Sequence, residues 1–196
     1  MNVLLVSAHP CADSFTHAVA GAAQRGLESG GHDVTSLDLY ALGFDTAMSR
    51  AELDAYRAQQ PPPDPLARAH GELVRSSDVL VFVYPTWWSG LPAVLKGWLE
   101  RVLVPGVAFD FDAQGKVRPG MQHVHRIVGI STYGSPWTYI KVVNDNGRRI
   151  LTRSLRLSCG RRTPTTWLGL YSIDTTGDSE RAAFLDRVEH AMDRIR

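Results

Sequence analysis

Cysteine is scarce in this chain, and so is net charge of either sign. Only Cys11 and Cys159 occur among 196 residues, and their spacing matches neither a disulfide framework nor a metal motif. His123 and His125 alternate without a third ligand at a fixed spacing, so we expect no metal centre. Two free thiols are typical of a protein kept in a reducing compartment.

Charge and hydropathy exclude several kinds of partner. The formal net charge is +1, which argues against nucleic acid and against an anionic membrane surface. No apolar run approaches the roughly 20 residues that span a bilayer, so no membrane insertion is expected. The segment 1–6 enters a strand without a basic region or a cleavage site. We therefore expect no signal peptide and a cytoplasmic location.

The apolar pattern changes repeatedly between the period of a strand and that of a helix. It predicts five strands, over 2–7, 33–38, 78–84, 126–132 and 163–171. It predicts helices over 15–29, 66–75, 91–104, 145–157 and 180–195, and a short helix capped by Ser49 with Glu52. The proline-rich segment 59–65 is expected to be a surface loop, and 105–122 a long irregular stretch.

Strands that alternate with helices predict an α/β fold with a parallel sheet covered on both faces. We expect one domain over residues 1–196, with five strands in the order 2-1-3-4-5. A ligand site is then expected at the carboxyl ends of strands one and three.

Three loops at that edge carry chemistry. In 8–17, Ser14 and Thr16 offer hydroxyls beside a helix N-terminus, with His9 as a third donor; alternatively Asp13 or Ser14 only caps the helix. In 84–98, Trp87 and Trp88 either pack in the core or line a cavity or interface.

The third loop, 131–139, is either a ligand-binding loop or an ordinary turn. In the first case Gly134 permits close approach of backbone amides to a ligand, and Tyr139 offers a phenol. In the second case the turn packs Trp137 and Tyr139 on a surface helix. Lys96 and Glu100 are expected to form a solvated pair. A basic run is either a solvated helix face or a contact for an anionic nicotinamide cofactor: Arg148, Arg149, Arg153, Arg156, Arg161 and Arg162.

Together, hydrogen-bond donors for a phosphate, an aromatic wall and a cluster of backbone amides at one edge favour a flavin mononucleotide-like ligand. The motifs at 8–15, 85–102 and 131–139 resemble those of the flavodoxin-like NAD(P)H:quinone oxidoreductases, mammalian and bacterial. Two positions depart from that family: Tyr133 stands where glycine is common, and 144–146 stand where the mammalian enzymes have a catalytic histidine.

The resemblance implies roles for individual residues. The flavin phosphate region would be held by His9, Ser14, Phe15 and Thr16. The isoalloxazine would be lined by Pro85, Thr86, Trp87, Trp88 and Ser89. Its N1 and O2 would face Thr132, Tyr133 and Gly134. Tyr139 would stabilise charge on the reduced flavin.

The resemblance also implies an activity and partners. FAD or FMN would take hydride from NADH or NADPH and pass it to a quinone or similar acceptor in two ping-pong steps. A homodimer is implied, with Phe109, Phe111 and Trp137 at its interface. Two alternatives remain: a flavodoxin-type electron carrier, and a flavin-binding ancillary subunit of a cation-efflux transporter.

Overall fold

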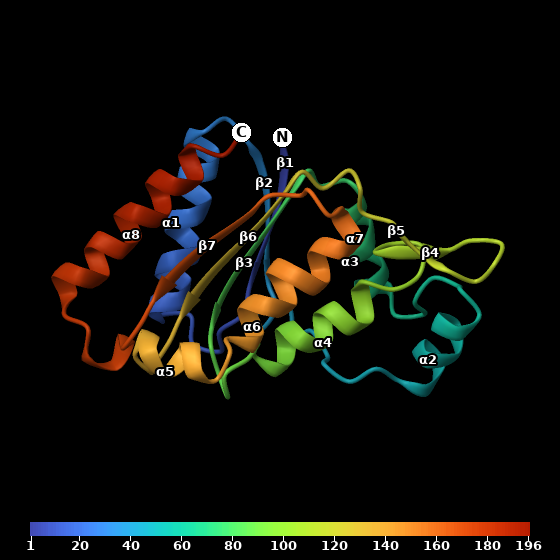
Figure 1. Cartoon of the computed structure of the whole chain (residues 1–196), viewed down its shortest axis with the longest axis horizontal. Coiled ribbons are helices and arrows are strands. Elements are labelled where there is room, and N and C mark those ends of the chain that lie inside the picture. The colour runs from blue at the N-terminus through green and yellow to red at the C-terminus, as the bar shows by residue number, and fades with distance from the viewer.

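A computed structural model describes the whole chain, Met1–Arg196. Five parallel strands form the central sheet: β1 (Asn2–Ser7), β2 (Asp33–Asp38), β3 (Val79–Pro85), β6 (Arg126–Thr132) and β7 (Thr165–Leu170). Their order, β2-β1-β3-β6-β7, confirms the predicted order 2-1-3-4-5. All five strands run the same way, so their carboxyl ends share one edge, which lies at the bottom of Figure 1.

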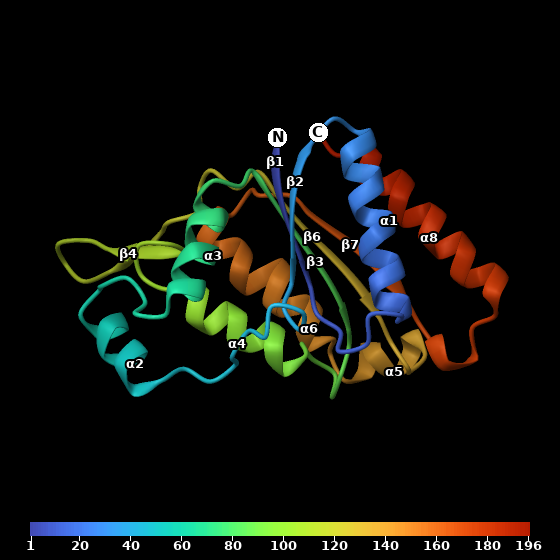
Figure 2. The same ribbon diagram turned by 180° about the vertical axis from the view of Figure 1, so that it is seen from behind.

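Helices cover both faces of the sheet (Figures 1 and 2). One face carries α1 (Phe15–Ser29) and α8 (Asp178–Asp193); the other carries α3 (Pro65–Arg75), α4 (Ala93–Val102) and a helix built from α6 (Asn146–Arg149), η1 (Ile150–Leu155) and α7 (Arg156–Cys159). Alternate residues of β1 point to opposite cores, Val3 to one and Leu4 to the other. This burial on both sides explains why the strands read as continuous apolar runs.

Local signals set several helix ends. Ser49 and Glu52 form the predicted capping box at the start of α2 (Arg50–Arg57). Asp64 caps α3 and Pro65 takes its first position, so the predicted loop ends one residue early. Pro92 precedes α4, which is shorter at both ends than the predicted 91–104.

The predicted irregular stretch 105–122 contains a β-hairpin, so that prediction was wrong in part. Strands β4 (Phe109–Phe111) and β5 (Val117–Pro119) pair antiparallel beside α2. Each strand has three residues, too few to show an alternating pattern. Asp112 holds the turn by accepting hydrogen bonds from the N–H groups of Gln114 and Lys116. Phe109 and Phe111, for which a dimer interface was implied, are half-buried within the chain itself.

Two further helical features were not predicted. Helix α5 (Trp137–Val142) follows the third loop directly, where glycine, serine and proline suggest only a turn. The segment η1 is π-helical, and the short 3₁₀ turn η2 (Ile173–Thr175) precedes α8. None of the helices combines the length and the apolar character that crossing a bilayer requires.

Candidate functional site

The three predicted loops meet at the carboxyl edge of the sheet. The ring centroids of His9 and Trp87 are 6.0 Å apart, which brings the first loop against the second. The N–H of Thr86 donates to the carbonyl of Thr132 at 2.7 Å, and the hydroxyls of Thr86 and Ser131 are 2.8 Å apart. These contacts confirm that the loops converge.

The first loop presents the N-terminus of α1 to this edge. The hydroxyl of Ser14 accepts from the N–H of His17 at 3.3 Å, so Ser14, and not Asp13, is the cap. The N–H groups of Phe15 and Thr16 donate to no acceptor in the chain. Free N–H groups at the positive end of a helix dipole favour an anion such as a phosphate.

A histidine that was not singled out from the sequence supports this N-terminus. His17 Nδ1 lies 3.0 Å from the Ser14 hydroxyl, and its Nε2 lies 2.8 Å from Asp38 Oδ2 at the end of β2. Burial raises the pKa of Asp38, but the hydrogen bond and charge of His17 together with hydrogen bonds from the N–H groups of Ala41 and Tyr40 outweigh it, and the net pKa is lowered. The pair joins two elements 21 residues apart, so no local motif marks it. His9 is held within its own loop, where Nδ1 accepts from the N–H of Cys11 at 3.1 Å.

The second loop is a strained two-residue turn. Trp87 and Gly90 exchange backbone hydrogen bonds of 3.2 and 3.0 Å, and the residues between them, Trp88 and Ser89, have φ of 49° and 56°. Asn and Gly normally occupy such a turn, because other residues are crowded at positive φ. Trp88 is fully exposed and Trp87 is 40% exposed, so the core-packing interpretation is wrong for both. The N–H groups of Trp88 and Ser89 donate to no acceptor.

The third loop directs its tyrosine inward. Tyr133 is buried, its ring stacks on Tyr171 with centroids 4.6 Å apart, and its N–H donates to the Leu170 carbonyl. Neither this N–H nor this phenol is therefore free for a ligand, whereas the N–H groups of Gly134 and Ser135 are free. A Cβ on Gly134 would lie 2.9 Å from Asp174 Oδ2, at the end of an exposed side chain that can move aside, so glycine is not required here by packing.

Helix α5 carries Tyr139 beyond this loop. Trp137 and Tyr139 are each 51% exposed, and the Tyr139 hydroxyl bonds to no other residue. From Trp137 onward the segment is therefore a surface helix itself, and the expectation of an ordinary turn packed on another helix is wrong there. Lys96 and Glu100 form the expected exposed pair on α4.

Asp145 occupies the segment where the mammalian pattern has its histidine. The Tyr133 phenol donates to Asp145 Oδ2 at 3.1 Å, and the Arg148 N–H donates to Oδ1 at 3.4 Å. Burial raises the pKa of Asp145. The buried hydroxyl of Tyr84 lies nearby without a partner, and burial raises its pKa strongly, with Tyr133 and Asp145 adding to the effect. Burial therefore opposes the ionisation of both groups.

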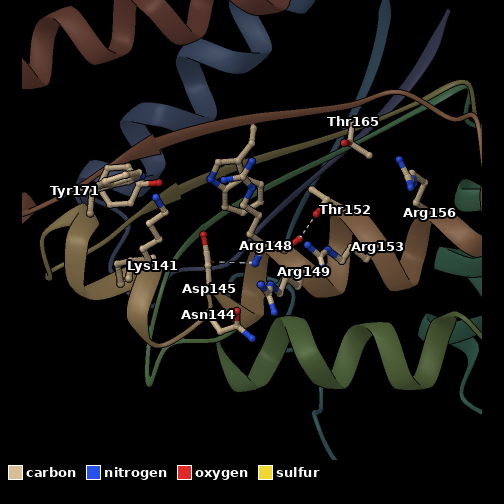
Figure 3. A pocket seen from close by; sticks show the side chains of 13 residues that line it. Lys141, Asn144, Asp145, Arg148, Arg149, Thr152, Arg153, Arg156, Thr165 and Tyr171 are labelled. Atoms are coloured by element: carbon tan, nitrogen blue, oxygen red, sulfur yellow. Dashed lines mark hydrogen bonds between the residues drawn. The ribbon is translucent and has the colours of Figure 1, made fainter.

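Four of the six arginines in the basic run line one pocket (Figure 3). The pocket has a volume of about 570 Å³ and lies between α5, the α6–η1–α7 helix and β7. Arg161 and Arg162 lie outside it. Arg148, Arg149, Arg153 and Arg156 therefore lie on a helix face that opens onto this pocket, and Arg148 and Arg153 are exposed there.

The fold agrees with the comparison to known protein families. The model of one family, described as having a flavodoxin-like fold, matches residues 1–188. The chain belongs to this flavodoxin-like family. Its relatives include NAD(P)H dehydrogenase (quinone) 1 of Rattus norvegicus, 34% identical over 153 residues, which cover 70% of this chain and 56% of the rat protein. The chain thus spans about half the length of the first curated relatives it matches.

Solved structures extend the comparison of this flavodoxin-like chain. Smu.1420 of Streptococcus mutans superposes with a TM-score of 0.87 at 29% identity, covering all of both chains. An NAD(P)H:quinone oxidoreductase of Methanothermobacter marburgensis gives 0.83 at 27% identity, covering 98% of this chain and 94% of the other. An FMN-dependent NADH-azoreductase of Bacillus anthracis, solved with FMN, gives 0.75 at 17% identity, covering 98% of each chain, and shares the fold.

Proposed function

We propose that the chain is a single flavin-binding domain that transfers hydride from NAD(P)H to a quinone or similar acceptor. The observation that carries this proposal is the set of free N–H groups on three loops at one sheet edge: Phe15, Thr16, Trp88, Ser89, Gly134 and Ser135. A flavin presents a phosphate and a ring edge rich in acceptors, so these donors fit it. Relatedness to NAD(P)H:quinone oxidoreductases supports the reaction.

The N-terminus of α1 would hold the flavin phosphate. The N–H groups of Phe15 and Thr16 have no acceptor and lie at the positive end of the α1 dipole. Ser14 and His9 belong to the same loop. This phosphate region is common to FMN and FAD, so both remain within the proposal. The azoreductase of the same fold was solved with FMN.

The second and third loops would hold the ring system. Pro85, Thr86, Trp87, Trp88 and Ser89 would line one side, with the free N–H groups of Trp88 and Ser89 toward the ring edge. Gly134 N–H would donate near N1 and O2, with Thr132 and Tyr133 as the backbone that positions it. Loss of one such donor typically slows a reaction by about 10²–10³.

The bound flavin would supply hydride transfer, and the protein would supply position and protons. Tyr139 would stabilise negative charge at the reduced ring. Because donor and acceptor would use one face of the ring in turn, ping-pong kinetics are expected. An obligatory ternary complex in steady-state kinetics would contradict this scheme.

We also propose that the chain forms a homodimer around this edge. Fully exposed Trp88 and half-exposed Trp137 and Tyr139 lie on the two loops of the proposed ring site, and Val142 of α5 is 83% exposed. An exposed apolar patch of this kind usually marks a surface that another protein chain covers. A monomeric mass by light scattering at micromolar concentration would contradict this part of the proposal.

The decisive experiment combines a spectrum with a turnover assay. Purified protein should carry, or bind on reconstitution, a yellow chromophore that mass spectrometry identifies as FMN or FAD. It should then oxidise NADH or NADPH in the presence of a quinone, a nitroaromatic or an azo compound. Protein that binds no flavin overturns the proposal. Flavin binding without NAD(P)H oxidation would instead favour the electron carrier or the transporter subunit.

A further inference from the structure

The pocket between α5, the α6–η1–α7 helix and β7 concentrates positive charge that the chain does not neutralise. Five cations line it: Lys141, Arg148, Arg149, Arg153 and Arg156. None of them takes part in any of the ion pairs of the structure. Its volume of about 570 Å³ is in the range of small-molecule sites.

The single carboxyl group on the wall of the pocket is already engaged. Asp145 accepts hydrogen bonds from the Tyr133 phenol and from the Arg148 N–H, and it pairs with no guanidinium. Two buried donors of residues that line the pocket, Arg156 Nε and Trp167 Nε1, have no hydrogen-bond partner. Buried polar groups are nearly always hydrogen-bonded, so unpartnered donors in a cationic pocket indicate an anionic ligand.

Aromatic side chains give the pocket flat walls. Trp167 and Tyr171 line it from the strand side, with the Arg148 guanidinium 5.6 Å from the Trp167 ring centroid. Figure 3 shows Arg149, Arg153 and Arg156 following the helix along the opposite side. The π-helical turn η1, a form that is rare and often found at functional sites, carries Arg153.

The pocket adjoins the proposed flavin edge. Tyr133 belongs to the third loop, and its hydrogen bond to Asp145 joins that loop directly to the pocket wall. Trp137 and Lys141 of α5 continue the same wall. A planar molecule at the ring edge can therefore extend a charged group toward the arginines.

We propose that this pocket binds the phosphate or carboxylate-type anion of a planar substrate of the reductase. The anion itself follows from the unpaired cations, and its assignment to a substrate rests on the proposed function. Two sources share this chemistry, the phosphates of the nicotinamide donor and an acid group on the acceptor.

Binding is tested first without turnover. Inorganic pyrophosphate is titrated calorimetrically, at constant ionic strength, into the wild-type protein and two double variants. Arg148→Gln/Arg153→Gln removes two exposed pocket charges, and Arg161→Gln/Arg162→Gln removes two exposed charges outside the pocket. We expect saturable binding that weakens about tenfold or more in the pocket variant and about twofold or less in the control. Absence of saturable binding, or equal weakening in both variants, overturns the pocket.

The source of the anion is distinguished by kinetics. A rise in KM for NADPH or NADH in the pocket variant assigns the pocket to the donor. A rise for naphthoquinone-2-sulfonate, but not for neutral naphthoquinone, assigns it to the acceptor. Pyrophosphate binding with no change in any KM overturns the substrate assignment. Pyrophosphate binding in a protein that never oxidises NAD(P)H upholds the anion pocket and overturns the proposed reductase.

Discussion

The Tyr133 phenol donates a 3.1 Å hydrogen bond to Asp145 Oδ2, although the two residues belong to the β6 loop and the start of α6. Asp145 has φ of 43°, a conformation that Asp and Asn tolerate better than most residues. The contact joins the proposed flavin edge to the cationic pocket. It also places a carboxyl group where burial opposes its ionisation, since burial raises the pKa of Asp145.

Replacement of Asp145 by Asn should therefore change stability in a pH-dependent way. A carboxyl group whose pKa is higher in the folded than in the unfolded protein contributes its full stability only at a pH below the unfolded-state pKa. This contribution is lost as the pH rises through the folded-state pKa. The introduced asparagine would still accept the hydrogen bond of Tyr133, but it cannot ionise and so avoids the cost of a buried charge. The stability of the Asp145→Asn variant relative to wild type should therefore improve from pH 4 to pH 7. The gain should be about 1 kcal/mol or less, because the carboxyl is partly exposed. Urea unfolding at both pH values measures it. The exposed control Asp186→Asn should show no such trend; a trend of equal size there would refute the assignment to Asp145.

Arg101 should be a major determinant of stability. Its side chain is 5% exposed and donates to Glu52 Oε1 at 2.7 Å, to Asp64 Oδ2 at 2.6 Å and to the Asp45 carbonyl. Arg101→Met leaves the buried Glu52 without its cation, so we expect a loss of about 3–5 kcal/mol in the free energy of unfolding. Urea unfolding measures this loss.

The matched control is Arg50→Met, which breaks the exposed pair with Asp54. Exposed pairs contribute about 0–1 kcal/mol, so this variant should be nearly as stable as wild type. If the free energy of unfolding fell equally in the two variants, burial of the Arg101 ion pair would not be the cause of its contribution.

Trp88→Asn should stabilise the flavin-free protein while weakening flavin binding. Asn is better suited to the positive φ of this turn, and relief of the strain is worth about 1 kcal/mol. The same change removes the exposed aromatic wall from the proposed ring site. Thermal unfolding without flavin and fluorescence titration with FMN report the two effects. Trp137→Asn, outside the turn, should not raise stability, and an unchanged FMN affinity in Trp88→Asn would exclude Trp88 from the site.

Ser14→Asp separates the cap of α1 from the proposed phosphate site. Aspartate is as good a cap as serine, so the free energy of unfolding should change by about 0.5 kcal/mol or less. Its charge would repel a phosphate, so FMN affinity should fall about tenfold or more. Riboflavin, which lacks the phosphate, is the control ligand and should bind both proteins equally. Equal loss for the two ligands would place the phosphate elsewhere.

The two thiols should differ in reactivity with an alkylating reagent. Cys11 is exposed in the first loop, whereas Cys159 is buried at the end of α7, where burial raises the pKa of its thiol to about 12. Because the thiolate is the reactive form, mass spectrometry of the native protein should find the label on Cys11 alone. In urea both residues should be labelled. Labelling of Cys159 under native conditions would show that α7 opens readily.

The sequence by itself determined the sheet and most of its helices, because burial on both faces and local caps leave marks within a few residues. The strand at 2–7, the helix at 15–29 and the capping box at Ser49 needed no distant contact to be recognised. Tertiary structure alone decided where side chains point and which residues meet. It placed Tyr133 inward against Asp145, Trp88 outward on a strained turn, His17 against Asp38, and four arginines around one pocket. Each of these depends on contacts between segments or on backbone torsions that sequence periodicity does not encode.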